Sequence, residues 1–175
     1  MLRHGISHKS FPDFSFSRPA GFTIIEVIMV IVIVGILAGM AIPRFDSFYG
    51  MKMESAVKKM ITDIRYVQQI AVSRHTNTRI VFNPGNDTYT AQEETSPGSG
   101  TWNSITDPYT RSNLTMNFHA DAQYGGIDLS GASFGGISTL QFNLEGKPVD
   151  GGTVSLGYHG WSKTITIEAN TGFIR

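Results

Sequence analysis

The stretch that decides the fold is GFTIIEVIMVIVIVGILAGMAIP, residues 21–43. Between Phe22 and Ile42 its only polar side chains belong to Thr23 and Glu26. As an α-helix these 21 residues would span about 31 Å, which matches the hydrocarbon core of a bilayer. We therefore expect one hydrophobic transmembrane helix over residues 22–43. The alternative is a secretory signal peptide, with Gly39-Met40-Ala41 as a weak cleavage site.

Outside this run, the composition is that of a folded, water-exposed domain. The chain has 175 residues with 11 Phe, 6 Tyr and 2 Trp, enough aromatic side chains to predict a packed core. It has no cysteine, which excludes disulfides, zinc-thiolate sites and thiol nucleophiles. Its 14 basic and 14 acidic residues give no overall attraction to nucleic acid. A polytopic membrane protein is excluded because only one segment is apolar enough.

The residues before the apolar run are interpreted as a leader peptide, residues 1–21. They carry Arg3, Lys9 and Arg18 against a single Asp13, and their apolar residues follow no helical or strand period. A basic flank before an apolar helix usually stays in the cytoplasm. This orientation places the rest of the chain on the far side of the membrane.

Glu26 is the one charge inside the apolar run. A carboxylate at the centre of a membrane helix costs about 2.5–3.5 kcal/mol, and no Lys or Arg in the run can neutralise it. Cleavage after Gly21 would give Phe22 a free amine, four residues before Glu26 and on the same helical face. That amine could also pair with the Glu26 of a neighbouring copy and fix axial register. The simpler alternative is that Glu26 extends to the membrane surface.

The run from Gly21 to Glu26, followed by an uncharged span and Pro43, resembles the N-terminal signature of type IV prepilins and type II secretion pseudopilins. The resemblance implies that a prepilin peptidase cuts between Gly21 and Phe22 and methylates the new amine, which keeps its positive charge. The apolar helix would stay on the mature protein. The implied partners are other pilin or pseudopilin subunits, an inner-membrane assembly platform and, before assembly, membrane lipid.

This resemblance also implies a route through the cell: a single-pass inner-membrane precursor with a periplasmic head, then a pilus or a periplasmic pseudopilus. Gly35 and Gly39 form a G-x-x-x-G motif, which in an ordinary membrane helix indicates a dimer face. With Pro43 they also weaken the helix, and we favour local unwinding of this region during assembly.

Residues 44–75 are expected to form an amphipathic helix that continues into the head. An apolar stripe with spacings of three and four supports it, and Lys58, Lys59, Asp63 and Gln69 are expected elsewhere on its surface. The members of the stripe are Ala56, Met60, Ile64, Val67 and Ala71.

Residues 76–175 are expected to form a β-rich head. A hairpin is predicted around the turn Asn83–Asp87, a long exposed loop over 94–113, and turns over the Gly-rich segment 125–136. The predicted strands are Thr78–Phe82, Tyr89–Glu93, Leu114–Phe118, Thr139–Leu144, Thr153–Leu156, Lys163–Glu168 and a last one near Phe173 and Ile174. Because no second helix separates them, we expect antiparallel pairing. The predicted class is α+β and pilin-like: one long N-terminal helix packed on a small antiparallel sheet.

The C-terminal part resembles the GspH/FimT group of minor pilins. Phe142-x-x-x-Gly146 matches the turn that precedes paired strands in that group, and Gly172-Phe173-Ile174-Arg175 matches its terminal strand. The absence of cysteine agrees, because many major pilins carry a C-terminal disulfide loop.

No motif indicates an enzyme, and we expect no cofactor and no metal. Gly131-Ala132-Ser133-Phe134-Gly135 fits a nucleophile elbow, with Asp150 and His159 following in hydrolase order. We interpret it as a chance match in a Gly-rich segment, because no helix is expected after it. His75, His119 and His159 are isolated in the sequence. The oxygens of Asn83–Asp87 could hold calcium, although turn formation explains these residues equally well.

DNA is the remaining candidate partner, because some FimT-like minor pilins serve in DNA uptake. The cations of the later head are Arg111, Lys147, Lys163 and Arg175, of which Lys163 and Arg175 are the candidate contacts. Four phosphate contacts would give only weak, salt-sensitive binding. The alternative to a filament subunit is therefore a membrane-anchored β-domain that binds a ligand or DNA and does not polymerise.

Overall fold

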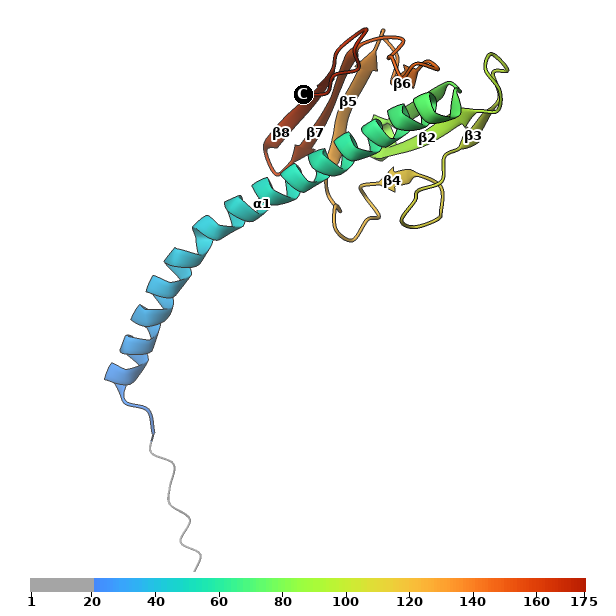
Figure 1. The fold of residues 1–175 in the computed structure, drawn as a ribbon. Helices are drawn as coiled ribbons and strands as arrows, with labels where there is room; N and C mark the ends of the chain where they lie inside the picture. Colours follow the sequence, from blue (N-terminus) through green and yellow to red (C-terminus); the bar gives the residue numbers. More distant parts are fainter. Residues whose placement is uncertain (1–20) are drawn as a thin grey trace, which may run out of the picture. The chain divides into compact units, whose positions relative to one another are not determined.

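The computed structural model describes residues 21–175, except for the side chains of residues 41–47. Nearly all of the predicted leader therefore lies outside the described residues, as does the side chain of Pro43. The chain divides into two compact units, one ending at Ile42 and one spanning Pro43–Arg175. The long helix α1 belongs to both units, and Figure 1 shows its C-terminal part lying across the strands of the second unit.

Helix α1 runs from Ile24 to Arg74 and continues through Gly35, Gly39 and Pro43. It ends because His75 adopts a left-handed conformation, with φ of 50°. The N–H of Thr76 then reaches back to the carbonyl of Ala71 at 3.3 Å, as in a Schellman C-cap. The Nδ1 atom of His75 lies 2.7 Å from the carbonyl oxygen of Val72, so this isolated histidine serves to terminate the helix.

The first sheet contains β1 (Thr78–Asn83), β2 (Thr88–Glu94), β3 (Trp102–Ser104), β4 (Thr115–Asn117) and β6 (Thr139–Phe142). Its order is β3-β2-β1-β6, and β4 also pairs with β2. All of these pairings are antiparallel. The predicted hairpin between β1 and β2 is confirmed, and the 3₁₀ turn Pro84–Asn86 closes it.

The second sheet is antiparallel, in the order β5-β7-β8, with β5 at Asp128–Phe134, β7 at Gly152–Tyr158 and β8 at Trp161–Ile167. A two-residue turn joins β7 to β8. Its residues His159 and Gly160 both have positive φ, 46° and 83°, as a type I′ hairpin requires.

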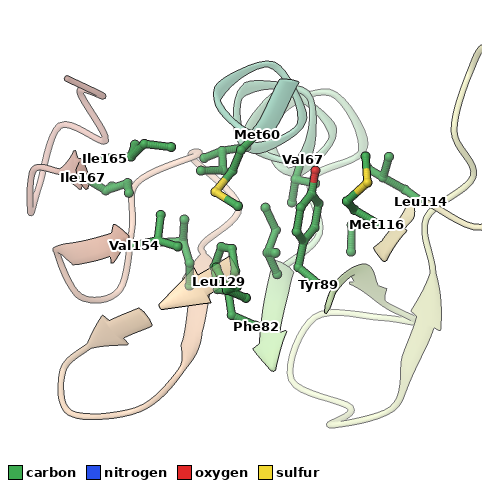
Figure 2. Close-up of a cluster of buried hydrophobic side chains, with 14 of the residues drawn as sticks. Met60, Val67, Phe82, Tyr89, Leu114, Met116, Leu129, Val154, Ile165 and Ile167 are labelled. Atoms are coloured by element: carbon green, nitrogen blue, oxygen red, sulfur yellow. The ribbon is translucent and has the colours of Figure 1, made fainter. Parts of the chain in front are cut away.

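The core lies between the C-terminal half of α1 and both sheets. All five residues of the predicted stripe, from Ala56 to Ala71, are fully buried. In Figure 2, Met60 and Val67 project from the helix toward Tyr89 of the first sheet and toward Val154 and Ile165 of the second. The predicted α+β class, a helix packed on antiparallel strands, is confirmed.

Three details of the predicted strands are wrong. The segment 125–136 contains strand β5 and not only turns, and the loop 94–113 contains the short strand β3. The last predicted strand is reduced to a single bridge between Ile167 and Ile174. Glycine misled the prediction for β5, because Gly131 lies inside the strand, opposite Ser155 of β7, and does not form a turn. A Cβ atom at Gly152 would collide with the backbone of Ser133 across the β5–β7 pair.

Candidate functional site

The N-terminal site begins with three residues that precede the helix. Gly21, Phe22 and Thr23 are exposed and non-helical, and no atom lies within 4 Å of a Cβ built at Gly21. The hydroxyl of Thr23 accepts a hydrogen bond from the N–H of Glu26 at 3.3 Å, so Thr23 caps α1. The Gly21–Phe22 peptide bond therefore lies outside the helix, in accessible backbone.

Glu26 lies in the first turn of α1, where its carboxylate is exposed and complements the positive end of the helix dipole. Phe22 and Glu26 would share a helical face only in a helix that begins at Phe22. The cap at Thr23 starts the helix at Ile24 instead. In the uncut chain Phe22 is therefore not part of the helical face that carries Glu26.

The surface of α1 that follows is apolar on every side. From Ile24 to Met40 its large apolar side chains are 48–82% exposed. No atom outside the helix backbone approaches a Cβ built at Gly35 or Gly39. Among the described residues, no helix has both the length and the apolar character needed to cross a membrane. The predicted unwinding at Gly35, Gly39 and Pro43 stays a prediction, because α1 is continuous there.

The candidate DNA contacts lie on neighbouring C-terminal elements. Lys163 is on β8, and the backbone of Arg175 bonds to Thr166 of the same strand. The guanidinium of Arg175 pairs with Glu168 at 2.9 Å, and the ammonium of Lys147 pairs with Glu145 at 2.7 Å. These two carboxylates reduce the positive charge that the tail could offer to phosphates.

The three residues of the apparent hydrolase pattern are not brought together. Ser133 lies within strand β5, opposite Thr153 of β7. His159 lies at the other end of β7, six residues further and about 20 Å away along an extended strand. No helix follows Ser133 to form a nucleophile elbow.

The acidic turn residues also have structural partners. The carboxylate of Asp87 accepts a hydrogen bond from the N–H of Leu129 at 2.9 Å, which joins the β1–β2 turn to β5. Within the residues that the structure describes, no group of three His, Cys, Asp or Glu side chains could hold a metal ion.

Sequence reasoning missed a buried polar cluster between α1 and the first sheet. Asp63 was expected on the surface, but it is only 6% exposed. Its carboxylate accepts a hydrogen bond from the Tyr89 hydroxyl at 2.6 Å and pairs with Lys59 at 2.6 Å. Burial, and then the charge of Asp63, raise the pKa of Tyr89 well above its ordinary value. The four-residue spacing of Lys59 and Asp63, which allows an ion pair along a helix, was the only feature of the sequence that indicated this cluster.

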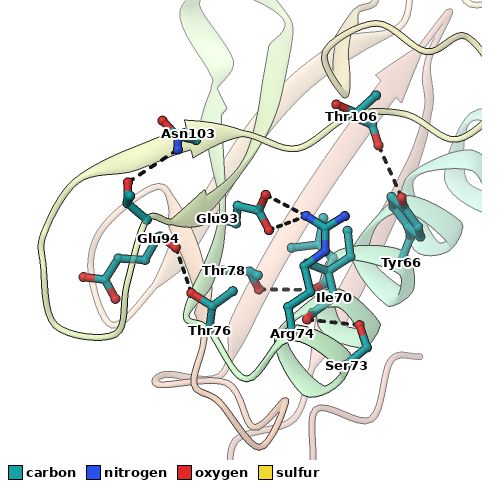
Figure 3. A network of polar contacts seen from close by, with 12 residues as sticks. Tyr66, Ile70, Ser73, Arg74, Thr76, Thr78, Glu93, Glu94, Asn103 and Thr106 are labelled. Atoms are coloured by element: carbon teal, nitrogen blue, oxygen red, sulfur yellow. Dashed lines mark hydrogen bonds and ion pairs between the residues drawn. The ribbon is translucent and has the colours of Figure 1, made fainter.

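A second unexpected carboxylate organises the loop between β2 and β3. Glu94 accepts hydrogen bonds from the backbone N–H groups of Gly100 and Gly98, at 2.7 and 3.0 Å, and from the amide of Asn77. These bonds, that of Gly100 first, lower its pKa. Figure 3 shows the nearby network, in which Thr76 bonds to the backbone of Glu94 and Arg74 pairs with Glu93.

Two protein-family models match this chain, one over its N-terminal segment and one over the head. A model of the prokaryotic N-terminal methylation motif matches residues 16–42, and a model of the type II transport protein GspH matches residues 56–171. The chain belongs to the GspH family. The predicted relation to prepilins and pseudopilins is thereby confirmed, and so is the expectation of a structural, non-enzymatic protein.

Solved structures share the fold of this GspH-family chain. Two structures of the minor pseudopilin EpsH from the type 2 secretion system of Vibrio cholerae match with TM-scores of 0.53 and 0.54 at 12% identity. They cover 70% and 71% of this chain and 93% and 92% of EpsH. The type IV minor pilin FimU of Pseudomonas aeruginosa matches with a TM-score of 0.47 at 15% identity, over 70% of this chain and 85% of FimU. No curated protein sequence matches.

The N-terminal motif implies processing by a prepilin peptidase, and the GspH family implies partners within a pseudopilus. Membrane anchoring follows from the same family relationship.

Proposed function

We propose that this chain is a minor pseudopilin subunit of a type II secretion pseudopilus, made as a membrane-inserted precursor. A prepilin peptidase cuts between Gly21 and Phe22 and methylates the Phe22 amine. The mature subunit then leaves the bilayer and joins a helical filament through the N-terminal half of α1. Its head faces the periplasm.

The observation that supports this proposal most strongly is an isolated carboxylate beside an accessible peptide bond. Gly21 and Phe22 lie in exposed, non-helical backbone, and Glu26 follows within the first helical turn. No other charged residue lies between Gly21 and Ile42. Cleavage would create the one cation near this carboxylate.

The exposed apolar surface of α1 supports the assembly step. From Ile24 to Met40 its large apolar side chains are exposed within the described part of their unit, so lipid would cover them before assembly and neighbouring helices afterwards. In the apolar filament interior, the Glu26 of one copy would pair with the amine of the next. Such a pair at about 4 Å is worth about 4 kcal/mol at an effective dielectric constant of about 20.

Neutralising Glu26 tests this role. Glu26→Gln keeps the shape of the side chain and removes its charge, so cleavage and methylation at Phe22 should continue while assembly falls at least about tenfold. Mass spectrometry of the N-terminus measures processing. Because the chain has no cysteine, Ile28→Cys can report helix contacts between copies by crosslinking in cells.

Glu54→Gln is the matched control, since Glu54 is an exposed acid further along the same helix. Wild-type crosslinking of the Glu26→Gln protein would contradict the register mechanism. If the chain that carries Ile28→Cys alone gives no crosslinks, the alternative of an anchored, non-polymerising domain is favoured.

A further inference from the structure

Aromatic side chains of α1 and of the β7–β8 hairpin gather where the helix enters the head. We call Phe48, Tyr49, Tyr158, His159 and Trp161 the aromatic collar. Tyr49 of the helix stacks on His159 with ring centroids 4.4 Å apart and also meets Tyr158 edge-on at 5.6 Å. The collar therefore joins the first helical turns of the head to the β7–β8 hairpin turn.

Two further contacts hold the hairpin against the helix. The ring of Trp161 lies 3.9 Å from a Cβ built at Gly50, an ordinary van der Waals distance, so the edge of the indole lies beside the helix. The ammonium of Lys52 lies 4.9 Å from the centroid of the Tyr158 ring and donates a hydrogen bond to the carbonyl of Gly125 at 2.7 Å. Lys52 therefore adds a fixed cation beside the aromatic rings.

Part of the apolar surface of the collar remains outside the core of the head, although Tyr158 packs against that core. Phe48 is 58% exposed, Trp161 is 46% exposed, and the adjacent Met51 is 66% exposed. The stripe residues that begin at Met53, within the next helical turn, are buried. The end of the head nearest to the N-terminal segment along the chain thus combines exposed apolar rings, polar ring atoms and a cation.

The collar follows the apolar run at a short distance along the chain. With Phe22 and Ile42 at the two edges of the hydrocarbon core, Phe48 comes six residues, or about 9 Å of helix, beyond the far edge. The headgroup layer is about 5–8 Å thick on each side, and helical side chains lean toward the N-terminus by part of a turn. The rings of Phe48 and Tyr49 can therefore reach headgroup depth.

We propose that the aromatic collar docks into the phospholipid headgroup layer while the subunit is anchored in the membrane. Trp and Tyr rings favour this layer because their apolar bodies and polar ring atoms are satisfied there together. The β7–β8 turn, which carries His159, would then contact the headgroup layer together with Tyr49. This inference rests on the proposed membrane insertion, and the partner is the lipid surface itself.

The two tryptophans of the chain provide the test. Trp102→Phe leaves Trp161 of the collar as the single fluorophore, and Trp161→Phe leaves Trp102, which lies on β3 of the other sheet and packs on Arg79 at 4.1 Å. Each full-length protein is reconstituted in phosphatidylcholine vesicles that contain headgroup-nitroxide lipid. We expect Trp161 to be quenched several-fold more strongly than Trp102.

An acyl-chain probe separates this inference from the proposed insertion. Ile31→Trp, in a chain without Trp102 and Trp161, should be quenched by lipid that carries nitroxide at mid-chain. If this probe is quenched but Trp161 is not, the collar inference is overturned and insertion stands. If the Ile31→Trp probe is not quenched, the proposed insertion fails as well.

Two other outcomes would also overturn docking. Equal quenching of Trp161 and Trp102 would show adsorption of the whole head rather than contact through the collar. Protection of Trp161 that disappears when the protein is diluted in lipid would show that a second copy of the chain, and not lipid, covers the collar.

Discussion

The two halves of α1 are continuous in sequence and opposite in their surroundings. In the C-terminal half one apolar stripe is fully buried against two sheets, and charged residues occupy the other faces. In the N-terminal half, from Ile24 to Met40, the apolar side chains cover every face and are 48–82% exposed. The first pattern indicates a partner within the chain, whereas the second requires partners outside it.

The largest effect is expected from blocking cleavage after Gly21. Without cleavage there is no Phe22 amine to pair with Glu26, so the N-terminal half of α1 cannot assemble with other subunits. Gly21→Ala should leave the uncut precursor in the membrane and abolish assembly. A Cβ at Gly21 has no neighbour within 4 Å, so the change should not disturb the fold. Mass spectrometry of the N-terminus measures the outcome, and normal cleavage would contradict the assigned position.

Truncating one isoleucine in each half of α1 should change the free energy of unfolding by very different amounts. Ile64→Ala removes a fully buried side chain and should lower the free energy of unfolding by about 2–5 kcal/mol. Ile31→Ala should change it by less than about 0.5 kcal/mol, since Ile31 is 64% exposed. Urea unfolding of the detergent-solubilised chain measures both, and equal losses would remove the distinction between the halves.

The buried contact between Tyr89 and Asp63 lies in the C-terminal, buried part of the molecule and should make its stability fall at high pH. Burial and the charge of Asp63 raise the pKa of Tyr89 above 10.0, so the protonated phenol stabilises the fold below pH 10 and this contribution is lost as the pH rises further. Tyr89→Phe removes the hydroxyl that bonds to Asp63, at a cost of about 1.5–3 kcal/mol at pH 7, and should remove this alkaline loss.

Tyr109→Phe is the control for Tyr89, because Tyr109 is 90% exposed. Chemical unfolding from pH 7 to pH 11 compares the two variants. An unchanged alkaline loss in the Tyr89→Phe protein would assign that loss to other groups.

The smallest effect is expected at acid pH from Glu94. Hydrogen bonds from Gly100 and Gly98 hold its pKa below 4.5, so its contribution is present above pH 4.5 and is lost as the pH falls through the lowered value. Glu94→Gln should be slightly less stable at pH 7 and should lose less stability on acidification. Thermal unfolding between pH 7 and pH 3, with Glu54→Gln as an exposed control, tests this.

Local pattern was sufficient for the features that repeat along the chain. The stripe from Ala56 to Ala71 has helical spacing, and the Asn83–Asp87 turn separates two alternating segments, so both were predicted before pairing was known. The burial of Asp63 was not predictable, because it depends on Tyr89 coming across from β2. Strand β5 was missed because its Gly-rich segment is typical of turns, and the close approach of Gly152 to Ser133 is visible only when β7 lies beside it.

The sequence by itself determined that one helix has two kinds of surface and that a single acid lies at its start, because these are properties of consecutive residues. Tertiary structure alone decided which polar side chains are buried, that Ser133 and His159 lie far apart, and that a hairpin turn from β7 and β8 meets the helix at Tyr49. These features depend on long-range strand register, which brings together residues that no local pattern connects.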